Sequence, residues 1–146
     1  MDLLVLVEDN DDDRDLALLA FKQAKVPGEL VAVADGEQAL AFLLSDGGGA
    51  PGKGKGEPKV VLLDLKLPKV DGLEVLRRIR ADSRTRYLPV VILTSSLEQA
   101  DLIESYRLGA NSYLRKPVNF LDFVELAERI GSYWGKFNQI PPANAA

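Results

Sequence analysis

The sequence predicts a doubly wound α/β domain, in which a parallel sheet is covered by helices on both faces. Five short runs rich in Val, Leu and Ile alternate with longer stretches of helical periodicity. The first, third and fourth runs are continuously apolar, which indicates strands buried on both faces. A length of 146 residues suits one domain with one sizeable core. The predicted strands are Leu3–Val7, Leu30–Ala34, Lys59–Leu63, Leu88–Leu93 and Ser112–Leu114.

The first predicted helix follows the first strand, where Asn10 and Asp11 offer N-cap oxygens. Three aspartates, Asp11 to Asp13, fall in its first turn, where the helix dipole favours anions. Pro27 and Gly28 end the helical pattern. We expect the buried stripe of this helix to consist of Leu16, Leu19, Ala20 and Ala24.

Two later helices are predicted from their N-terminal signals. The segment from Ser96 to Gln99 has the spacing of a capping box, and the helix that it opens should close at Gly109. Asn119 is expected to cap the last helix.

Residues 45–58 contain half of the chain's 12 glycines and have no apolar period. Their composition predicts a flexible insertion. A phosphate-binding glycine-rich loop is the alternative, but it needs a preceding strand, a following helix and a Gly-Lys-Ser/Thr ending, which this segment lacks.

Composition excludes several kinds of site. The chain has no cysteine and no histidine, so it has no disulfide, no thiolate and no phosphohistidine of its own. Any metal must therefore be bound by oxygen atoms.

Charge and hydropathy argue against binding to nucleic acid or to a membrane. The net charge is −4 and the basic residues are scattered. One basic cluster is interpreted as a solvated helix face. No stretch approaches the ~18 apolar residues of a membrane span, and the N-terminus lacks a basic region, so we expect a cytoplasmic protein. The cluster consists of Arg77, Arg78, Arg80, Arg84 and Arg86.

Polar residues follow four of the predicted strands, at the edge of the sheet where ligands bind in this fold class. Taken singly, each has an ordinary reading, such as a helix cap or a solvated lysine. Together, three carboxylates near one point repel each other and favour a hard divalent cation, Mg²⁺. An amine and a hydroxyl suit a phosphoryl group, with Asp64 as the nucleophile. The residues are Glu8 and Asp9, Asp64, Thr94 and Ser95, and Lys116 and Pro117.

These motifs resemble bacterial response-regulator receiver domains of the chemotaxis-regulator type over about Leu3 to Gly131. The resemblance implies a flavodoxin-like sheet of order 2-1-3-4-5 with five helices, the last one extended. The glycine-rich insertion and the tail with Tyr133 and Trp134 look most like stand-alone regulators paired with phytochrome-type histidine kinases. The motifs are Glu8-Asp9, Asp64 to Pro68 with Asp71-Gly72, Thr94-Ser95 and Tyr113 to Pro117.

The resemblance also implies a role for each residue. Asp64 would accept phosphate from a kinase phosphohistidine, in a self-catalysed transfer rather than a turnover enzyme's reaction. Mg²⁺ would be bound by Asp9, Asp64 and the backbone carbonyl of Lys66, with Glu8 acting through water. Lys116 would pair with the phosphoryl group.

Two further implications concern the switch and one peptide bond. Thr94 would move toward the phosphate and Tyr113 would follow it inward. The bond between Lys116 and Pro117 would be cis.

Three positions depart from the commonest pattern of the family. The first acidic position is Glu8 rather than Asp. This is a common variation in the family and is compatible with metal binding. Lys66 is expected to overhang the phosphoryl group and to change the rate of autodephosphorylation. Ser95 is larger than the usual residue and could crowd the phosphodonor.

The last helix has two apolar stripes. One, facing the sheet, consists of Phe120, Phe123, Val124, Ala127 and Ile130. The other would be exposed in a monomer and predicts a homodimer, unless the tail folds back on its own domain. We expect a receiver domain over residues 1–132 and a helical extension with a proline-containing tail over residues 133–146. The predicted dimer interface consists of Leu126, Ile130, Tyr133, Trp134, Phe137 and Ile140.

We expect a signalling switch with no output domain, which acts on protein partners. Two alternatives stay open. A phosphatase of the haloacid dehalogenase type also uses a nucleophilic aspartate, Mg²⁺ and a lysine, but it has a second aspartate where this chain has Lys66. A pseudo-receiver would bind partners without being phosphorylated.

Overall fold

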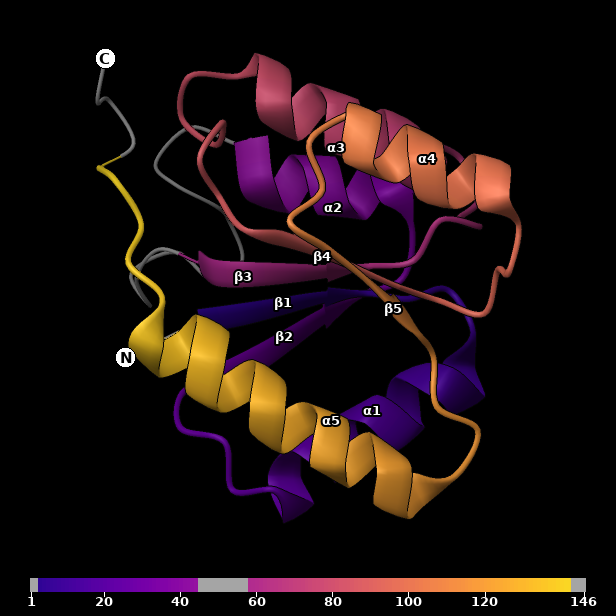
Figure 1. The fold of residues 1–146 in the computed structure, drawn as a ribbon, viewed down its shortest axis with the longest axis vertical. Coiled ribbons are helices and arrows are strands. Elements are labelled where there is room, and N and C mark those ends of the chain that lie inside the picture. The colour runs from indigo at the N-terminus through magenta and orange to yellow at the C-terminus, as the bar shows by residue number, and fades with distance from the viewer. Residues whose placement is uncertain (1–2, 45–57, 143–146) are drawn as a thin grey trace.

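The computed structural model describes residues 3–44 and 58–142. Its strands are β1 (Leu3–Val7), β2 (Glu29–Val33), β3 (Pro58–Leu63), β4 (Val90–Thr94) and β5 (Ser112–Arg115). They form a sheet of order β2-β1-β3-β4-β5 in which every neighbouring pair is parallel (Figure 1). The predicted fold class and strand order are confirmed. The predicted flexible insertion lies outside the described residues, apart from Pro58.

Helices cover both faces of this sheet. They are α1 (Asp11–Gln23), α2 (Gly36–Leu44), α3 (Gly72–Ala81), α4 (Gln99–Arg107), α5 (Phe120–Ser132) and the π-helix η1 (Tyr133–Phe137). Figure 1 shows α2, α3 and α4 on one face, and α1 and α5 on the other. Every described helix is too short or too polar to traverse a bilayer.

The strands contribute apolar side chains to both faces, as the continuous apolar runs predict. In β1, Leu3, Val5 and Val7 face the layer of α2 and α3, whereas Leu4 and Leu6 face α1 and α5. This alternation follows from the two-residue repeat of a strand. Two cores therefore hold the sheet from opposite sides.

The predicted stripe of α1 is wrong at Leu19, whose exposed fraction is 58%. The buried residues are Ala17, Ala20 and Phe21; the last two lie three and four residues after Ala17, on the same helical face. Leu16 and Ala24 pack partly at its edge. The prediction favoured the larger side chain, whereas the contact between α1 and α5 uses two alanines that allow close approach.

Two local predictions for β4 and α4 need correction. β4 begins at Val90 rather than Leu88, because Pro89 has no backbone N–H for the ladder. The predicted capping box is absent, since α4 has Glu98 at its N-cap with no side-chain cap bond. Ser96 instead donates its hydroxyl to Asp101 at 2.6 Å. Other signals are confirmed: Gly109, at φ 101°, ends α4, and Asn119 accepts from the Asp122 amide to cap α5.

The basic cluster on and after α3 is only partly a solvated face. Arg77 and Arg78 both pair with Glu74 at the surface. Arg80 is half-buried and donates to the backbone carbonyls of Leu88 at 2.6 Å and Gly109 at 2.9 Å. It therefore fastens α3 to the segments that lead into β4 and β5.

Gly72, at the start of α3, lies directly behind the two residues that follow β3. A Cβ added there would be 2.2 Å from the carbonyl oxygen of Asp64 and 2.6 Å from Cα of Leu65. The amide of Gly72 donates to the Leu65 carbonyl at 2.9 Å. The absence of a side chain therefore allows α3 to pack against the backbone that positions Asp64.

We predict that Gly72→Ala lowers the free energy of unfolding by about 1–3 kcal/mol, because backbone atoms must shift to admit the methyl group. Gly135→Ala is the matched control, since a Cβ at Gly135 has no atom within 4 Å. The control should stay within about 1 kcal/mol of the parent chain. Urea unfolding measures both, and equal stability of the two variants would refute the prediction.

Candidate functional site

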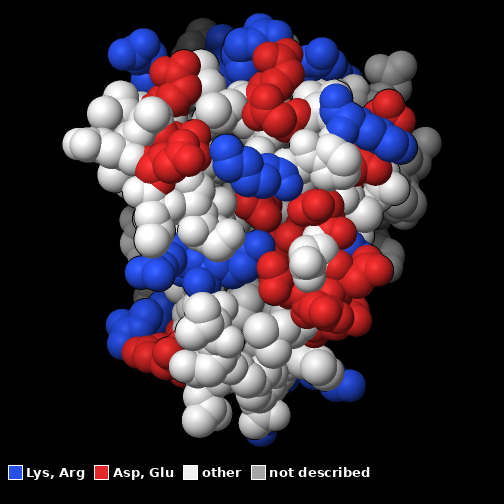
Figure 2. All heavy atoms as spheres, turned by 90° about the vertical axis from the view of Figure 1, so that its right-hand side faces the viewer, with Lys and Arg blue, Asp and Glu red and all other residues white. Residues whose placement is uncertain are grey.

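The predicted site residues come together at the carboxyl edge of the sheet. Glu8 and Asp9 follow β1, Asp64 follows β3, Thr94 ends β4, and Lys116 follows β5. Because the strands are parallel, their carboxyl ends share one edge. Acidic side chains gather on this face of the molecule (Figure 2).

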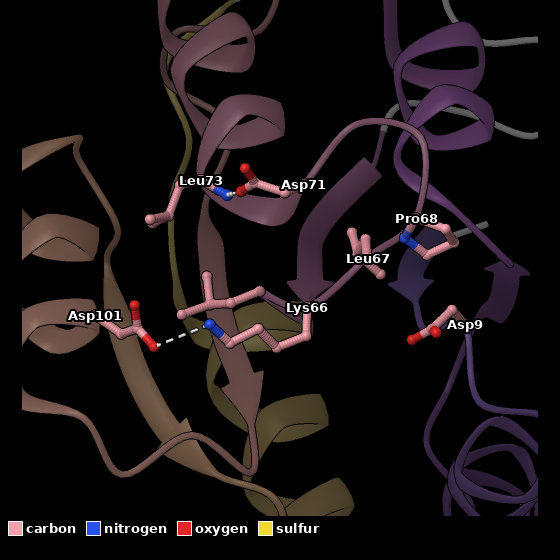
Figure 3. A pocket seen from close by; sticks show the side chains of 8 residues that line it. Asp9, Lys66, Leu67, Pro68, Asp71, Leu73 and Asp101 are labelled. Atoms are coloured by element: carbon pink, nitrogen blue, oxygen red, sulfur yellow. Dashed lines mark hydrogen bonds and ion pairs between the residues drawn. The ribbon is translucent and has the colours of Figure 1, made fainter.

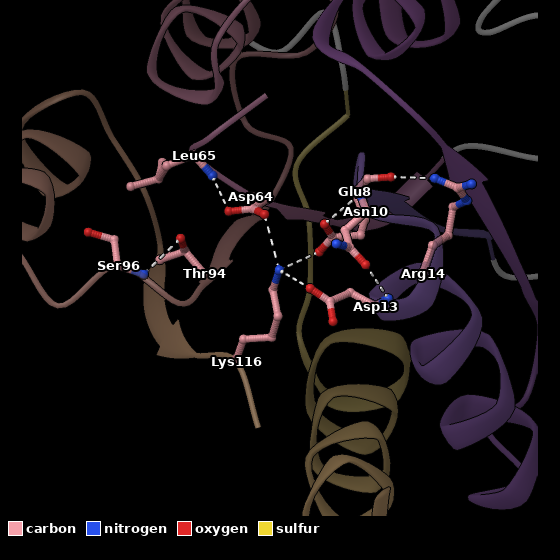
Figure 4. Close-up of polar contacts among 9 residues, drawn as sticks. All are labelled: Glu8, Asn10, Asp13, Arg14, Asp64, Leu65, Thr94, Ser96 and Lys116. Carbon is pink, nitrogen blue, oxygen red and sulfur yellow. Dashed lines mark hydrogen bonds and ion pairs between the residues drawn. The ribbon is translucent and has the colours of Figure 1, made fainter. Parts of the chain in front are cut away.

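Lys116 is the centre of the site. Its ammonium lies 2.7 Å from Oε1 of Glu8, 3.0 Å from Oδ2 of Asp13 and 3.1 Å from Oδ2 of Asp64 (Figure 4). The side chains of Lys116, Glu8 and Asp64 are 9%, 5% and 7% exposed. Asp13 was not predicted as a site residue. It falls in the first turn of α1, which points toward the strand ends.

Burial and charge pull in opposite directions at this cluster. Burial raises the pKa of Glu8, and the hydrogen bond from Lys116 offsets only part of that effect. Burial alone would lower the pKa of Lys116, but its hydrogen bond to Glu8, the charge of Asp64 and its hydrogen bond to Asp13 outweigh burial and raise this pKa. Lys116 is therefore a cation throughout the physiological range.

Glu8, Asp9 and Asp64 form a compact oxygen cluster. One carboxylate oxygen from each lies within 4.8 Å of the others, and Asp9 is exposed whereas the other two are buried. Lys116 balances only part of this negative charge. The residual charge and the oxygen donors fit a hard divalent cation.

Asp64 is held in a defined orientation. Its Oδ1 accepts from the backbone amide of Leu65 at 2.7 Å, and its Oδ2 accepts from Lys116. The carboxylate is buried at 6% exposure but lies at the rim of the sheet. One oxygen is thus fixed by the backbone and the other by a cation.

Ser96 joins the two predicted switch residues. Its amide donates to Oγ1 of Thr94 at 3.2 Å, and its carbonyl accepts from the Tyr113 hydroxyl at 3.3 Å. Thr94 is fully buried and Tyr113 is partly buried. Motif spacing does not reveal this role of Ser96, because its partners come from β4, β5 and α4.

The side chain of Lys66, which is expected to overhang the phosphoryl group, extends toward α4 in this structure. Its ammonium lies 3.6 Å from Asp101 on α4, with 69% of the side chain exposed (Figure 3). The ion pair spans a hollow of about 450 Å³ beside Asp9. Asp101 also accepts from Ser96, so it links the loops after β3 and β4. The lining residues are Asp9, Leu65, Lys66, Leu67, Pro68, Asp71, Leu73 and Asp101.

The predicted cis bond between Lys116 and Pro117 is wrong, because none of the described residues has a cis peptide bond. The trans form is the lower-energy isomer by about 0.5–1 kcal/mol. The backbone amide of Lys116 donates to the carbonyl of Thr94 at 2.8 Å and continues the ladder beyond β5.

The two predicted stripes of the last helix have different outcomes. The stripe toward the sheet is confirmed, with Phe123, Ala127 and Ile130 buried and Phe120 and Val124 packed partly beside them. Ile130 also belonged to the predicted dimer interface, but at 3% exposure it is occupied by its own core.

The rest of that predicted interface divides into two groups. Leu126 and Trp134 pack partly against the chain's own core. Tyr133 and Phe137 are 52% and 65% exposed, and Ile140 is partly buried. The tail therefore folds back in part, as the alternative to a dimer predicted, and leaves two aromatic residues at the surface.

Comparison with known proteins agrees with this geometry. The family model of the response regulator receiver domain matches residues 4–128. The chain is 42% identical to the "Probable methanogenesis regulatory protein FilR2" of Methanothrix harundinacea, over 95% of this chain and 87% of that protein. It is 37% identical to the response regulator Rcp1 of Synechocystis, over 97% of this chain and 94% of that protein.

Solved structures of response regulators are also similar to this chain. The Mn²⁺-bound form of Rcp1 superposes with a TM-score of 0.80, at 36% identity over 95% of this chain and 98% of that chain. The phosphorylated cyanobacterial phytochrome response regulator RcpA superposes with a TM-score of 0.83, at 35% identity over 95% and 97% of the two chains. With its five-stranded sheet and its acidic cluster around one lysine, the protein belongs to the response regulator receiver domain family.

Proposed function

We propose that this receiver accepts a phosphoryl group on Asp64 from the phosphohistidine of a sensor kinase and passes the signal to protein partners. The observation that carries this proposal is the pairing of Asp64 with Lys116 beside two further carboxylates. A nucleophile, a cation and metal-binding oxygens are thus present at one accessible edge. The phosphatase alternative lacks such support, because Lys66 stands where its second aspartate would be.

The proposed transfer is an in-line displacement at phosphorus. An oxygen of Asp64 bonds to phosphorus as the bond from phosphorus to the donor imidazole breaks, and the imidazole leaves with the electron pair. Lys116 stabilises negative charge on the phosphoryl oxygens. Thr94, at the end of the neighbouring strand, offers a hydroxyl to the same group.

The proposed metal is Mg²⁺, which would offset charge repulsion between the carboxylates and the phosphoryl group. Asp9, Asp64 and the backbone carbonyl of Lys66 would bind it, and Glu8 would act through water. The Mn²⁺ in the solved structure of Rcp1 supports a divalent cation of this class.

The proposed switch uses Thr94 and Tyr113. When Thr94 turns toward the phosphoryl group, the loop with Ser96 must rearrange, since Ser96 contacts both residues. Tyr113 then loses its present partner and moves inward. Phosphorylation would bias this equilibrium, and autodephosphorylation would reset it.

The surface of α4 is the proposed exit for the signal. It lies beside β5, which contains Tyr113. Its Leu102, Ile103 and Tyr106 are 39%, 52% and 51% exposed.

We predict that Asp64→Asn abolishes phosphorylation by acetyl phosphate with Mg²⁺, because the amide is not a nucleophile. Asp71→Asn is the matched control: Asp71 is an exposed aspartate near Asp64 that caps α3, and asparagine caps equally well. Intact-mass measurement gives the readout. Phosphorylation of the Asp64 variant, or its absence from the parent chain, would refute the proposed function, and the latter result would favour a pseudo-receiver.

We predict that Mg²⁺ raises the Tm of the parent chain and that Asp9→Asn removes most of this rise. A gain of roughly 3–6 °C is expected for the parent chain at saturating metal. Asp9 is exposed and can be changed without breaking the ion pairs of Lys116. In the presence of a chelator the variant should be at least as stable as the parent chain, because one repelling charge is gone.

Asp12→Asn is the control for loss of a charge near the metal site. It should keep the response to Mg²⁺. A full response in the Asp9 variant would count against Asp9 as a ligand.

We propose a phytochrome-type histidine kinase as the partner and the cytoplasm as the location. RcpA, a phytochrome response regulator, is similar to this chain over nearly its full length. A kinase that donates from phosphohistidine acts in the cytoplasm, where this receiver would meet it. Transfer from a purified kinase of this type is the direct assay.

We propose a homodimer through the tail and a boundary between a receiver over residues 1–132 and an extension over residues 133–146. Tyr133 and Phe137 are the exposed members of the proposed interface. The proposed interface would also include the exposed surface of Leu126, Trp134 and Ile140. Ile130 is buried and takes no part in it. A second copy would cover both aromatic rings.

We predict that the double variant Tyr133→Ser/Phe137→Ser sediments as a monomer and that the parent chain sediments as a dimer. Removal of two apolar contacts from a small interface should weaken the dimer by about tenfold or more. Leu97→Ser is the control, since Leu97 is 69% exposed in the loop before α4 and is not part of the proposed interface. A dimer that persists in the double variant would rule out this interface.

A further inference from the structure

The hydrogen-bonding capacity of Lys116 is saturated. A lysine ammonium has three N–H donors. Three carboxylates, from Glu8, Asp13 and Asp64, lie within hydrogen-bonding distance of it at 2.7, 3.0 and 3.1 Å (Figure 4). A phosphoryl oxygen can therefore bond to Lys116 only if one carboxylate gives up its place.

Asp13 is the partner that can leave at the least cost. Its side chain is 39% exposed, whereas those of Glu8 and Asp64 are 5% and 7% exposed. Glu8 is also held by the backbone amide of Asn10, and Asp64 itself receives the phosphoryl group. When the Asp13 carboxylate rotates outward, water replaces the lost hydrogen bond, whereas a displaced Glu8 would remain buried without a donor.

The position of Asp13 in α1 is suited to this role. Its backbone amide donates to Oδ1 of Asn10 at 2.9 Å, so the N-cap fixes its main chain. Only the side chain needs to move. A change of one side-chain rotamer on a surface turn is compatible with an intact helix.

We infer that Asp13 is a positioning residue of the phosphoryl site. Its carboxylate holds Lys116 before transfer and yields that donor to a phosphoryl oxygen afterwards. This inference rests on the proposed function. It adds that Asp13 opposes phosphorylation through its contact with Lys116. A chain without that contact takes up a phosphoryl group more readily.

Asp12 provides a matched control. It lies in the same first turn of α1 and has the same charge, but its carboxylate is not among the three that contact Lys116. Asp12→Asn and Asp13→Asn remove equal charge from the same helix end. A difference between the two variants therefore reports the contact with Lys116 and not general repulsion of an anion.

The experiment measures the affinity of the full chain for beryllofluoride with Mg²⁺, a phosphoryl mimic, by NMR titration. We expect Asp13→Asn to bind about two- to fivefold more tightly than Asp12→Asn, the range of a partly exposed ion pair. Asp13→Glu, which restores a carboxylate, should return toward the parent affinity. The rate of phosphorylation by acetyl phosphate should follow the same order.

The possible outcomes distinguish a failure of the role of Asp13 from a failure of the proposed phosphorylation of Asp64. Equal or weaker binding by Asp13→Asn, relative to Asp12→Asn, overturns the role of Asp13. A parent chain that neither binds beryllofluoride nor accepts phosphate overturns the proposed function itself. At high salt, the difference between the two variants should persist, because screening acts mainly on the long-range term. Circular dichroism checks the fold, and Asp13→Ser is the second variant if the asparagine disturbs α1.

Discussion

The ammonium of Lys116, bound by three carboxylates, is the interaction on which the rest of the site depends. Lys116 follows β5, while Asp64 and Glu8 follow β3 and β1, so its side chain passes over the end of β4 to reach them. This reach requires the strand order and the parallel register of the whole sheet. Without the cation, Glu8 and Asp64 would be buried side by side as uncompensated charges, at a high cost in stability.

The site nevertheless keeps an excess of negative charge, and this excess is what suits it to a metal and a phosphoryl group. Burial already raises the pKa of Glu8, so the cluster is not arranged for the greatest stability. Such unfavourable electrostatics are typical of functional sites. Asp13, the more exposed carboxylate, adds a contact that can be exchanged with little disturbance of the fold.

The packing around the site couples a rearrangement at Thr94 to the exposed surface of α4. Gly72 lets α3 lie against the backbone of Asp64, which keeps the nucleophile fixed. On the other side, Ser96 contacts Thr94 and Tyr113, while its hydroxyl bonds to Asp101 on α4. A rearrangement at Thr94 therefore reaches an exposed helix through one short segment. The rigid and the adjustable parts of the site belong to different loops.

The sequence by itself determined the order of the elements, the burial of the sheet on both faces and the residue types at the strand ends, because these depend on periodicity and on chain-local signals. It identified Glu8, Asp9, Asp64 and Lys116 since each lies within two residues of the end of a predicted strand. Only the tertiary structure decided which side chains meet. The buried face of α1, the burial of Ile130 and the links made by Asp13 and Ser96 depend on how distant segments pack, and spacing along one chain does not encode those contacts.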